Sequence, residues 1–187
     1  MKKTLIIIIV VLVIGTLTFF MIKTSSKDIL SNMLGQSKSQ TTNQKIGDKL
    51  LNNKAPYFDL SSIDDKRIKS SDFIDKPLIV VFWASWNVES ANQLKIIDDY
   101  KARNKDNLAS IISINSQEDK SVVKSFMRRG GYIVPTAIDT NGSITEDFNI
   151  KSLPTTFFID RDGVIRTIYS GVLSKEMFSS FVEPLLD

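Results

Sequence analysis

Three kinds of hydrophobic and polar pattern follow one another along the chain. An uncharged, almost wholly apolar run begins at Thr4 and ends at Ile22, and a polar stretch with little periodicity follows over residues 24–53. From residue 54, short apolar runs rich in β-branched residues alternate with segments in which apolar residues recur every three or four positions. The apolar runs indicate buried strands and the recurring positions indicate amphipathic helices, so one strand-and-helix domain is predicted over residues 54–187.

The same pattern predicts where the elements begin and end. Strands are expected over residues 57–60, 77–83, 108–114, 155–160 and 164–170, an extended segment over 132–138, a turn at 64–66, and helices over 87–104, 118–129 and 174–186. Pro135 argues against a central ladder position for the extended segment. Helical crossovers imply parallel strands, whereas the turn at residues 161–163 implies an antiparallel hairpin. The prediction is an α/β fold with a mixed central sheet and helices on both faces.

The run from Thr4 to Ile22 is long enough to cross a membrane. As a helix it would span roughly 28 Å, close to the hydrocarbon thickness of a bilayer. A cleaved signal peptide is the alternative, but its apolar region is usually shorter and is followed by a small-x-small site, which residues 21–28 do not supply. The pattern therefore predicts a single transmembrane signal-anchor helix over residues 4–23, ahead of the domain.

Charges at the ends of this run predict its orientation. Lys2 and Lys3 precede it together with the amino terminus, and Lys23 and Lys27 follow it. The positive-inside rule then favours cytoplasmic residues 1–3 and an extracytoplasmic domain, so the predicted location is the cell membrane, single-pass, with the lipid bilayer as a partner. Residues 24–53 are expected to form a polar, flexible tether, because their densest polar part, residues 36–44, cannot bury enough apolar surface to become ordered.

Composition removes several classes of function. The chain has 24 basic and 21 acidic residues, and Lys2, Lys3 and Lys23 account for its net charge of +3. The remainder is neutral, so no basic face for nucleic acid is indicated. There is no cysteine and no histidine. The chain therefore has no thiolate, no imidazole base and no usual zinc, haem or copper ligand set, and we expect neither a metal nor a cofactor.

Short motifs give the domain a resemblance to a known family. In order they are KAPYFDL at 54–60, VVFWASW at 80–86, SINSQED at 113–119, SLPTTFFID at 152–160 and RDG at 161–163. In this order and spacing they resemble the membrane-anchored TlpA/ResA-like thiol–disulfide oxidoreductases, from about Lys54 to the C-terminus. The resemblance implies a thioredoxin fold. An N-terminal anchor followed by a tether is also usual in that family.

The chemistry of that family resides in a C-x-x-C motif directly after the first buried strand. Here the motif positions are Asn87, Val88, Glu89 and Ser90. Neither an amide nor a hydroxyl exchanges with a disulfide, so no residue is assigned a catalytic role and the chain is expected to be redox-inactive. Asn87 is instead among the best N-cap residues, and Glu89 in the first turn favours the positive end of the helix.

The resemblance also implies a binding groove beside this motif. Pro154 matches the family's cis-proline, so we expect a cis peptide bond after Leu153, and in the family this segment pairs its backbone with an extended piece of substrate. That pairing needs no thiol. The groove expected to bind an unidentified extracytoplasmic protein comprises Trp86, Asn87, Val88, Glu89, Ser90, Leu153 and Pro154.

Two alternatives to a binding role stay open. One is an oxidoreductase of this family whose cysteines were substituted in this chain, and the other is a purely structural tethered domain. Cysteine-to-serine is a common engineering change, whereas cysteine-to-asparagine is not, and Val88-Glu89 also departs from the usual motif. Glu118, which resembles a glutamate near the site of some relatives, is interpreted mainly as a charge in the first turn of a helix.

Overall fold

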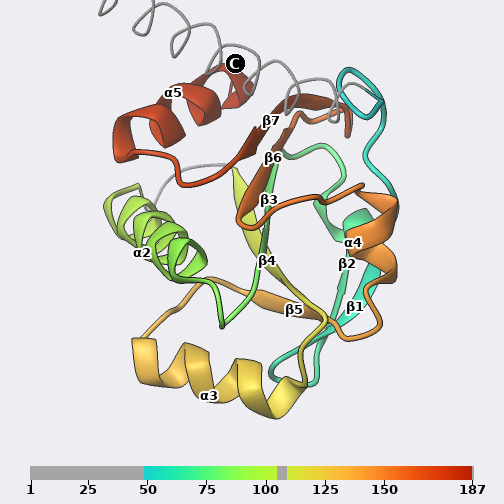
Figure 1. Cartoon of the computed structure of the whole chain (residues 1–187). Coiled ribbons are helices and arrows are strands. Elements are labelled where there is room, and N and C mark those ends of the chain that lie inside the picture. The colour runs from blue at the N-terminus through green and yellow to red at the C-terminus, as the bar shows by residue number, and fades with distance from the viewer. Residues whose placement is uncertain (1–48, 105–108, 187) are drawn as a thin grey trace, which may run out of the picture. The chain divides into compact units, whose positions relative to one another are not determined.

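The computed structural model describes residues 49–104 and 109–186 (Figure 1). The predicted anchor, its cytoplasmic end and nearly all of the predicted tether lie outside the described residues. The described residues belong to a compact unit that begins at Ile46. In this part of the chain, no helix has the length and apolar character needed to cross a membrane.

The described elements form one sheet with helices around it. The strands are β1 Asp59–Ser62, β2 Arg67–Lys69, β3 Leu78–Trp83, β4 Ser110–Ser116, β5 Thr136–Asp139, β6 Thr155–Ile159 and β7 Ile165–Ser170. The helices are the 3-10 turn η1 Ser70–Phe73 and α2 Val88–Arg103, α3 Lys120–Gly130, α4 Ser143–Asp147 and α5 Lys175–Leu186. All of the predicted strands and helices have a counterpart among them.

The sheet is mixed, as predicted. Its strands run in the order β2-β1-β5-β4-β3-β6-β7. The strands β3, β4 and β5 are parallel neighbours, whereas β6 pairs with β3, and β7 with β6, in the antiparallel sense. Because β3 and β4 are parallel and in register from Leu78↔Ser110 to Trp83↔Asn115, their carboxyl ends meet at one edge of the sheet. The residues that follow those two ends, together with the loop before β6, form the candidate site.

Two apolar layers hold the sheet between helices. Every residue of β3 is buried, and alternate side chains point to opposite faces. Ile79, Val81 and Trp83 pack with residues of α2, α3 and α5 on one face. The other face of the sheet packs against the α4 region, where Phe148 stacks edge-on against Phe157. Figure 1 shows α2 and α5 on one side of the strands and α4 on the other, which confirms the predicted arrangement.

The extended segment around Pro135 differs from its prediction. The strand β5 lies inside the sheet, between β1 and β4, although Pro135 argued against an interior position. The strand begins only at Thr136, so the proline precedes the ladder and removes none of its donors. The Pro135 carbonyl still takes part in pairing, because it accepts a hydrogen bond from Ser113 N–H at 2.8 Å.

Three short elements escaped prediction. They are β2, η1 and the five-residue helix α4. None is long enough to show a hydrophobic period of its own. The strand β2 is also an edge strand rich in charge, and its Arg67 bonds to Asp59 of β1 at 2.8 Å, which discourages pairing with other chains.

The predicted turn at residues 64–66 joins β1 to β2. The Ser62 hydroxyl accepts hydrogen bonds from the backbone N–H groups of Asp64 and Lys66, at 3.2 and 3.1 Å. Asp65 has a φ of 63°, a left-handed conformation that aspartate tolerates better than most residues. The Ser62 hydrogen bonds and the left-handed Asp65 backbone therefore both stabilise the predicted turn.

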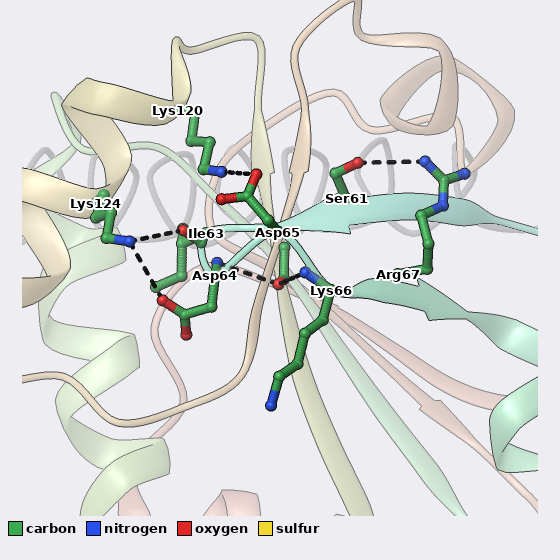
Figure 2. Close-up of polar contacts among 9 residues, drawn as sticks. Ser61, Ile63, Asp64, Asp65, Lys66, Arg67, Lys120 and Lys124 are labelled. Carbon is green, nitrogen blue, oxygen red and sulfur yellow. Dashed lines mark hydrogen bonds and ion pairs between the residues drawn. The ribbon is translucent and has the colours of Figure 1, made fainter.

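Two lysines of α3 bond to this turn and to the residue before it (Figure 2). Lys120 pairs with the Asp65 carboxylate. Lys124 donates to the Ile63 carbonyl at 3.2 Å and lies 3.5 Å from Asp64. The contacts are exposed, so each ion pair adds little to stability, but together they orient the hairpin against α3.

Candidate functional site

The site begins where β3 passes into α2. Asn87 is the N-cap of α2, with an extended backbone (φ −101°, ψ 116°), and its Oδ1 accepts a hydrogen bond from Ser90 N–H at 2.9 Å. Glu89 lies in the first turn, where its charge suits the helix dipole. The predicted cap is confirmed. Its effect is to satisfy one of the backbone donors that every helix start leaves unpaired.

Ser90, at the second position of the former motif, is fully buried. Its hydroxyl lies 3.4 Å from the backbone nitrogen of Ala84, under the first turn of α2. Solvent therefore does not reach it, and a polar group so placed stabilises the strand end instead of reacting.

A loop 66 residues further along the chain faces this helix start. The Leu153–Pro154 peptide bond is cis, as expected. The Nδ2 group of Asn87 donates to the Leu153 carbonyl at 3.1 Å, and Gly171 N–H donates to the Pro154 carbonyl at 2.8 Å. The fold therefore brings the motif positions and the proline together. The loop that carries the proline is bonded to the start of α2 on one side and to the end of β7 on the other.

Two apolar side chains stand exposed at this place. Trp86 is 70% exposed and Val88 is 77% exposed, while Leu153 is half-buried and Pro154 is buried. Within the described residues, nothing accepts a hydrogen bond from the Leu153 N–H. The site thus combines exposed apolar surface with an unpaired main-chain donor, which is the composition of a peptide-binding groove.

Glu118 bonds to the loop that follows β3, and its role was misinterpreted from the sequence. The helix α3 begins at Lys120, so Glu118 precedes it. Its carboxylate accepts hydrogen bonds from Ser85 N–H at 2.6 Å, from the Ser85 hydroxyl at 2.5 Å and from Asn115 Nδ2 at 2.7 Å. Ser85 and Asn115 were missed, although the parallel register of β3 and β4 places the end of one strand beside the end of the other.

Comparison with known proteins shows the family of the chain. Residues 51–168 match the AhpC/TSA family. The chain belongs to the AhpC/TSA family. The thiol-disulfide oxidoreductase ResA of Bacillus cereus is 26% identical over 157 residues, which cover 84% of this chain and 91% of that protein.

Two solved structures share the fold of this family member. A putative thiol:disulfide interchange protein DsbE from Chlorobium tepidum matches 73% of this chain and 98% of its own, with 23% identity and a TM-score of 0.69. The exposed lipoprotein thioredoxin Etrx1 of Streptococcus pneumoniae matches 70% of this chain and 100% of its own, with 24% identity and a TM-score of 0.63. The domain is a thioredoxin-like fold, similar to ResA and without any cysteine.

The missing thiols set the chemistry of this AhpC/TSA member. Thiol–disulfide exchange requires a thiolate that attacks a disulfide, and the chain has no sulfur nucleophile. Among the described residues, no group of three acidic, cysteine or histidine side chains could hold a metal ion. The arrangement at Asn87 and Leu153 therefore cannot exchange disulfides.

One carboxyl group of α2 has a raised pKa and lies about three turns beyond Asn87. Asp98 of α2 accepts a hydrogen bond from Ile133 N–H at 2.9 Å, which joins α2 to the loop before β5. Burial raises the pKa of Asp98 above its ordinary 3.8, and the backbone amides of Ile133 and Val134 oppose that shift. Asp98 thus contributes to positioning the loop rather than to any reaction.

Proposed function

We propose that this protein is a membrane-anchored, extracytoplasmic binding module. Its groove is formed by Trp86 to Glu89 and by the Leu153-Pro154 segment, and it takes an extended segment of another protein. Ser90, predicted as a groove residue, is buried beneath the start of α2 and does not line it. Binding replaces disulfide exchange as the function of the site. The observation that carries the proposal is the pairing of exposed Trp86 and Val88 with the unpaired Leu153 N–H, in a site without thiols.

The exposed side chains favour binding over a purely structural domain. Single exposed apolar residues are common on protein surfaces. Here Trp86 and Val88 lie two positions apart, on either side of Asn87, which itself bonds to the proline loop. Aromatic residues are also enriched at the centres of protein interfaces because they bury a large area with little loss of rotamer freedom.

The contacts of Asn87 favour a native binding site over an oxidoreductase with substituted cysteines. The Asn87 amide accepts one hydrogen bond within α2 and donates another to Leu153. A thiol is only a weak donor and acceptor and would not replace both bonds. Asparagine is therefore well suited to this position.

Location outside the cytoplasm rests on residues 1–53. The apolar run from Thr4 to Ile22 and the lysines that flank it support an uncleaved anchor with the bilayer as a partner. The likeness to Etrx1, an exposed lipoprotein, supports the same side of the membrane. The tether predicted to end at residue 53 is shorter than that, because Asn52 and Asn53 bond to Ile165 in the folded unit that begins at Ile46. A tether ahead of this unit would then let the domain reach partners near the membrane.

Photocrosslinking in intact cells tests the proposal. A photoreactive residue replaces Val88 in the full chain, and a matched chain carries it at Lys95, which is exposed two turns further along α2. We expect a discrete protein adduct from position 88 that is absent from position 95. The absence of any adduct specific to position 88 would instead support a purely structural tethered domain.

A further inference from the structure

Both ends of the Asn87 side chain are used. Its Oδ1 accepts from Ser90 N–H at 2.9 Å and its Nδ2 donates to the Leu153 carbonyl at 3.1 Å. We name this pair of hydrogen bonds the Asn87 bridge. The first bond lies within the helix start and would serve any helix, whereas the second joins residues that are 66 positions apart. Capping alone therefore does not account for the bridge.

The proline loop, residues 152–155, is fixed on its other side as well. Gly171 N–H donates to the Pro154 carbonyl at 2.8 Å, and the Thr155 hydroxyl donates to the Ser152 carbonyl at 2.8 Å. The loop is thus held between α2 and the end of β7. The bond from Asn87 holds the Leu153 carbonyl. It therefore restrains the residue that carries the Leu153 N–H.

We propose that Asn87 is the positioning residue of the groove. The inference rests on the binding function proposed above. The Asn87 bridge sets the distance between α2 and the proline loop, and it presents the Leu153 N–H to the main-chain carbonyl of an extended, cysteine-free polypeptide. A carbonyl oxygen has two lone pairs, so the Leu153 carbonyl can accept from Asn87 and from the incoming strand together.

The groove has no covalent bond with which to hold a ligand. A mixed disulfide holds a substrate while exchange proceeds. Without it, the affinity of the groove depends on main-chain pairing and on the apolar contacts of Trp86 and Val88. Binding to a loop that is already ordered avoids part of the entropy cost of association. A groove ordered by Asn87 should consequently bind a strand more tightly than the same groove with a free loop.

Substitutions at Asn87 separate the two bonds. Asn87→Ser keeps a good N-cap without adding charge, but its short side chain cannot reach the Leu153 carbonyl. Asn87→Asp also keeps the cap, and its carboxylate cannot donate a hydrogen bond. Asn92→Ser is the matched control, because Asn92 is exposed on the same helix and its side chain makes no hydrogen bond to the described residues.

The test is an NMR titration of the isotopically labelled full chain in detergent micelles. The probe is a capped peptide of alternating threonine and valine, which forms strands and has no cysteine. We expect its addition to shift the amide signals of Val88, Leu153 and Gly171 in the wild type and in Asn92→Ser alike. In Asn87→Ser and Asn87→Asp the affinity should be about two- to tenfold weaker, as expected for one hydrogen bond.

A second readout tests the bridge without any ligand. The Asn87 side-chain amide protons should exchange with solvent more slowly than those of Asn92, because only Asn87 is hydrogen-bonded. Fast exchange at Asn87, or equal peptide affinity in the wild type and Asn87→Ser, would overturn the positioning role. The absence of peptide-dependent shifts in the wild type would instead overturn the proposed function, even if the bridge itself is found.

Discussion

Replacing Glu118 should loosen the loop that carries Trp86 and Asn87 without removing any group from the groove. The Glu118 carboxylate accepts three hydrogen bonds, two from Ser85 and one from Asn115, at 2.5–2.7 Å. Asn115 is fully buried and Ser85 is half-buried. When the carboxylate is removed, water reaches these donors poorly, and they lose partners that the rest of the fold cannot supply.

The size of the effect follows from these bonds. A hydrogen bond to a charged group contributes about 1.5–3 kcal/mol net, and a buried donor left unsatisfied costs about 1–3 kcal/mol. The three bonds share one carboxylate and are not additive. We therefore expect Glu118→Ala to lower the free energy of unfolding by about 2–4 kcal/mol. Glu118→Gln should cost about 1–2 kcal/mol, because the amide keeps one acceptor but turns its own N–H groups toward a donor.

Urea unfolding followed by tryptophan fluorescence measures both values. The fragment should begin at residue 46, because Asn52 and Asn53 bond to the backbone of Ile165 at 2.8 and 2.9 Å and belong to the folded unit. Glu89→Gln is the control, since Glu89 is exposed in the first turn of α2 and should change stability by less than about 0.5 kcal/mol. A Glu118→Ala variant as stable as this control would refute the supporting role of the carboxylate.

Three further predictions concern the site, the pH dependence and the topology. The double substitution Asn87→Cys and Ser90→Cys should form an intramolecular disulfide and gain measurable but poor activity in an insulin-reduction assay. The helix start favours a thiolate at position 87, whereas the negative charge of Glu89 opposes one. Unpaired thiols would contradict the alignment of this site. Since burial raises the pKa of folded Asp98, its contribution to stability should fall as pH rises from its ordinary 3.8 through the raised value. Asp98→Asn should remove this pH-dependent loss, and urea unfolding at several pH values measures the free energy of unfolding of both proteins. A difference between the two free energies that does not change with pH would contradict the reasoning. Protease added to intact cells should cut within residues 36–44 and release the domain, whereas cleavage only after lysis would place the domain in the cytoplasm.

The parts of the fold that carry a local signal were predictable. The wholly apolar run of β3 indicated a strand buried on both faces, and Asn87 followed by Glu89 indicated the start of α2. Gly131 adopts a left-handed φ of 66° directly after α3, the conformation in which glycine commonly ends a helix. In each case neighbouring residues in the sequence are also the residues that interact.

The features that escaped prediction depend on contacts between distant segments. The bond from Asn87 to Leu153 links residues 66 apart, and nothing near Asn87 indicates it. Glu118 looked like a helix-start charge because a carboxylate before an amphipathic segment usually is one. Its actual partners lie 33 residues upstream at Ser85 and on the preceding strand at Asn115. Periodicity cannot report such pairings, because they appear only when the sheet brings strand ends together.

The choice of residue at position 87 separates a site that has merely lost its chemistry from one that has another use. A helix start requires only an acceptor, and serine, threonine and aspartate supply one as well as asparagine does. A bond to the Leu153 carbonyl requires a donor at the same position. Of the side chains that cap well, asparagine alone offers both an acceptor oxygen and a separate side-chain amide donor. Helix stability therefore accounts for Oδ1 and groove geometry for Nδ2, and the comparison of Asn87→Ser with the wild type measures the second alone.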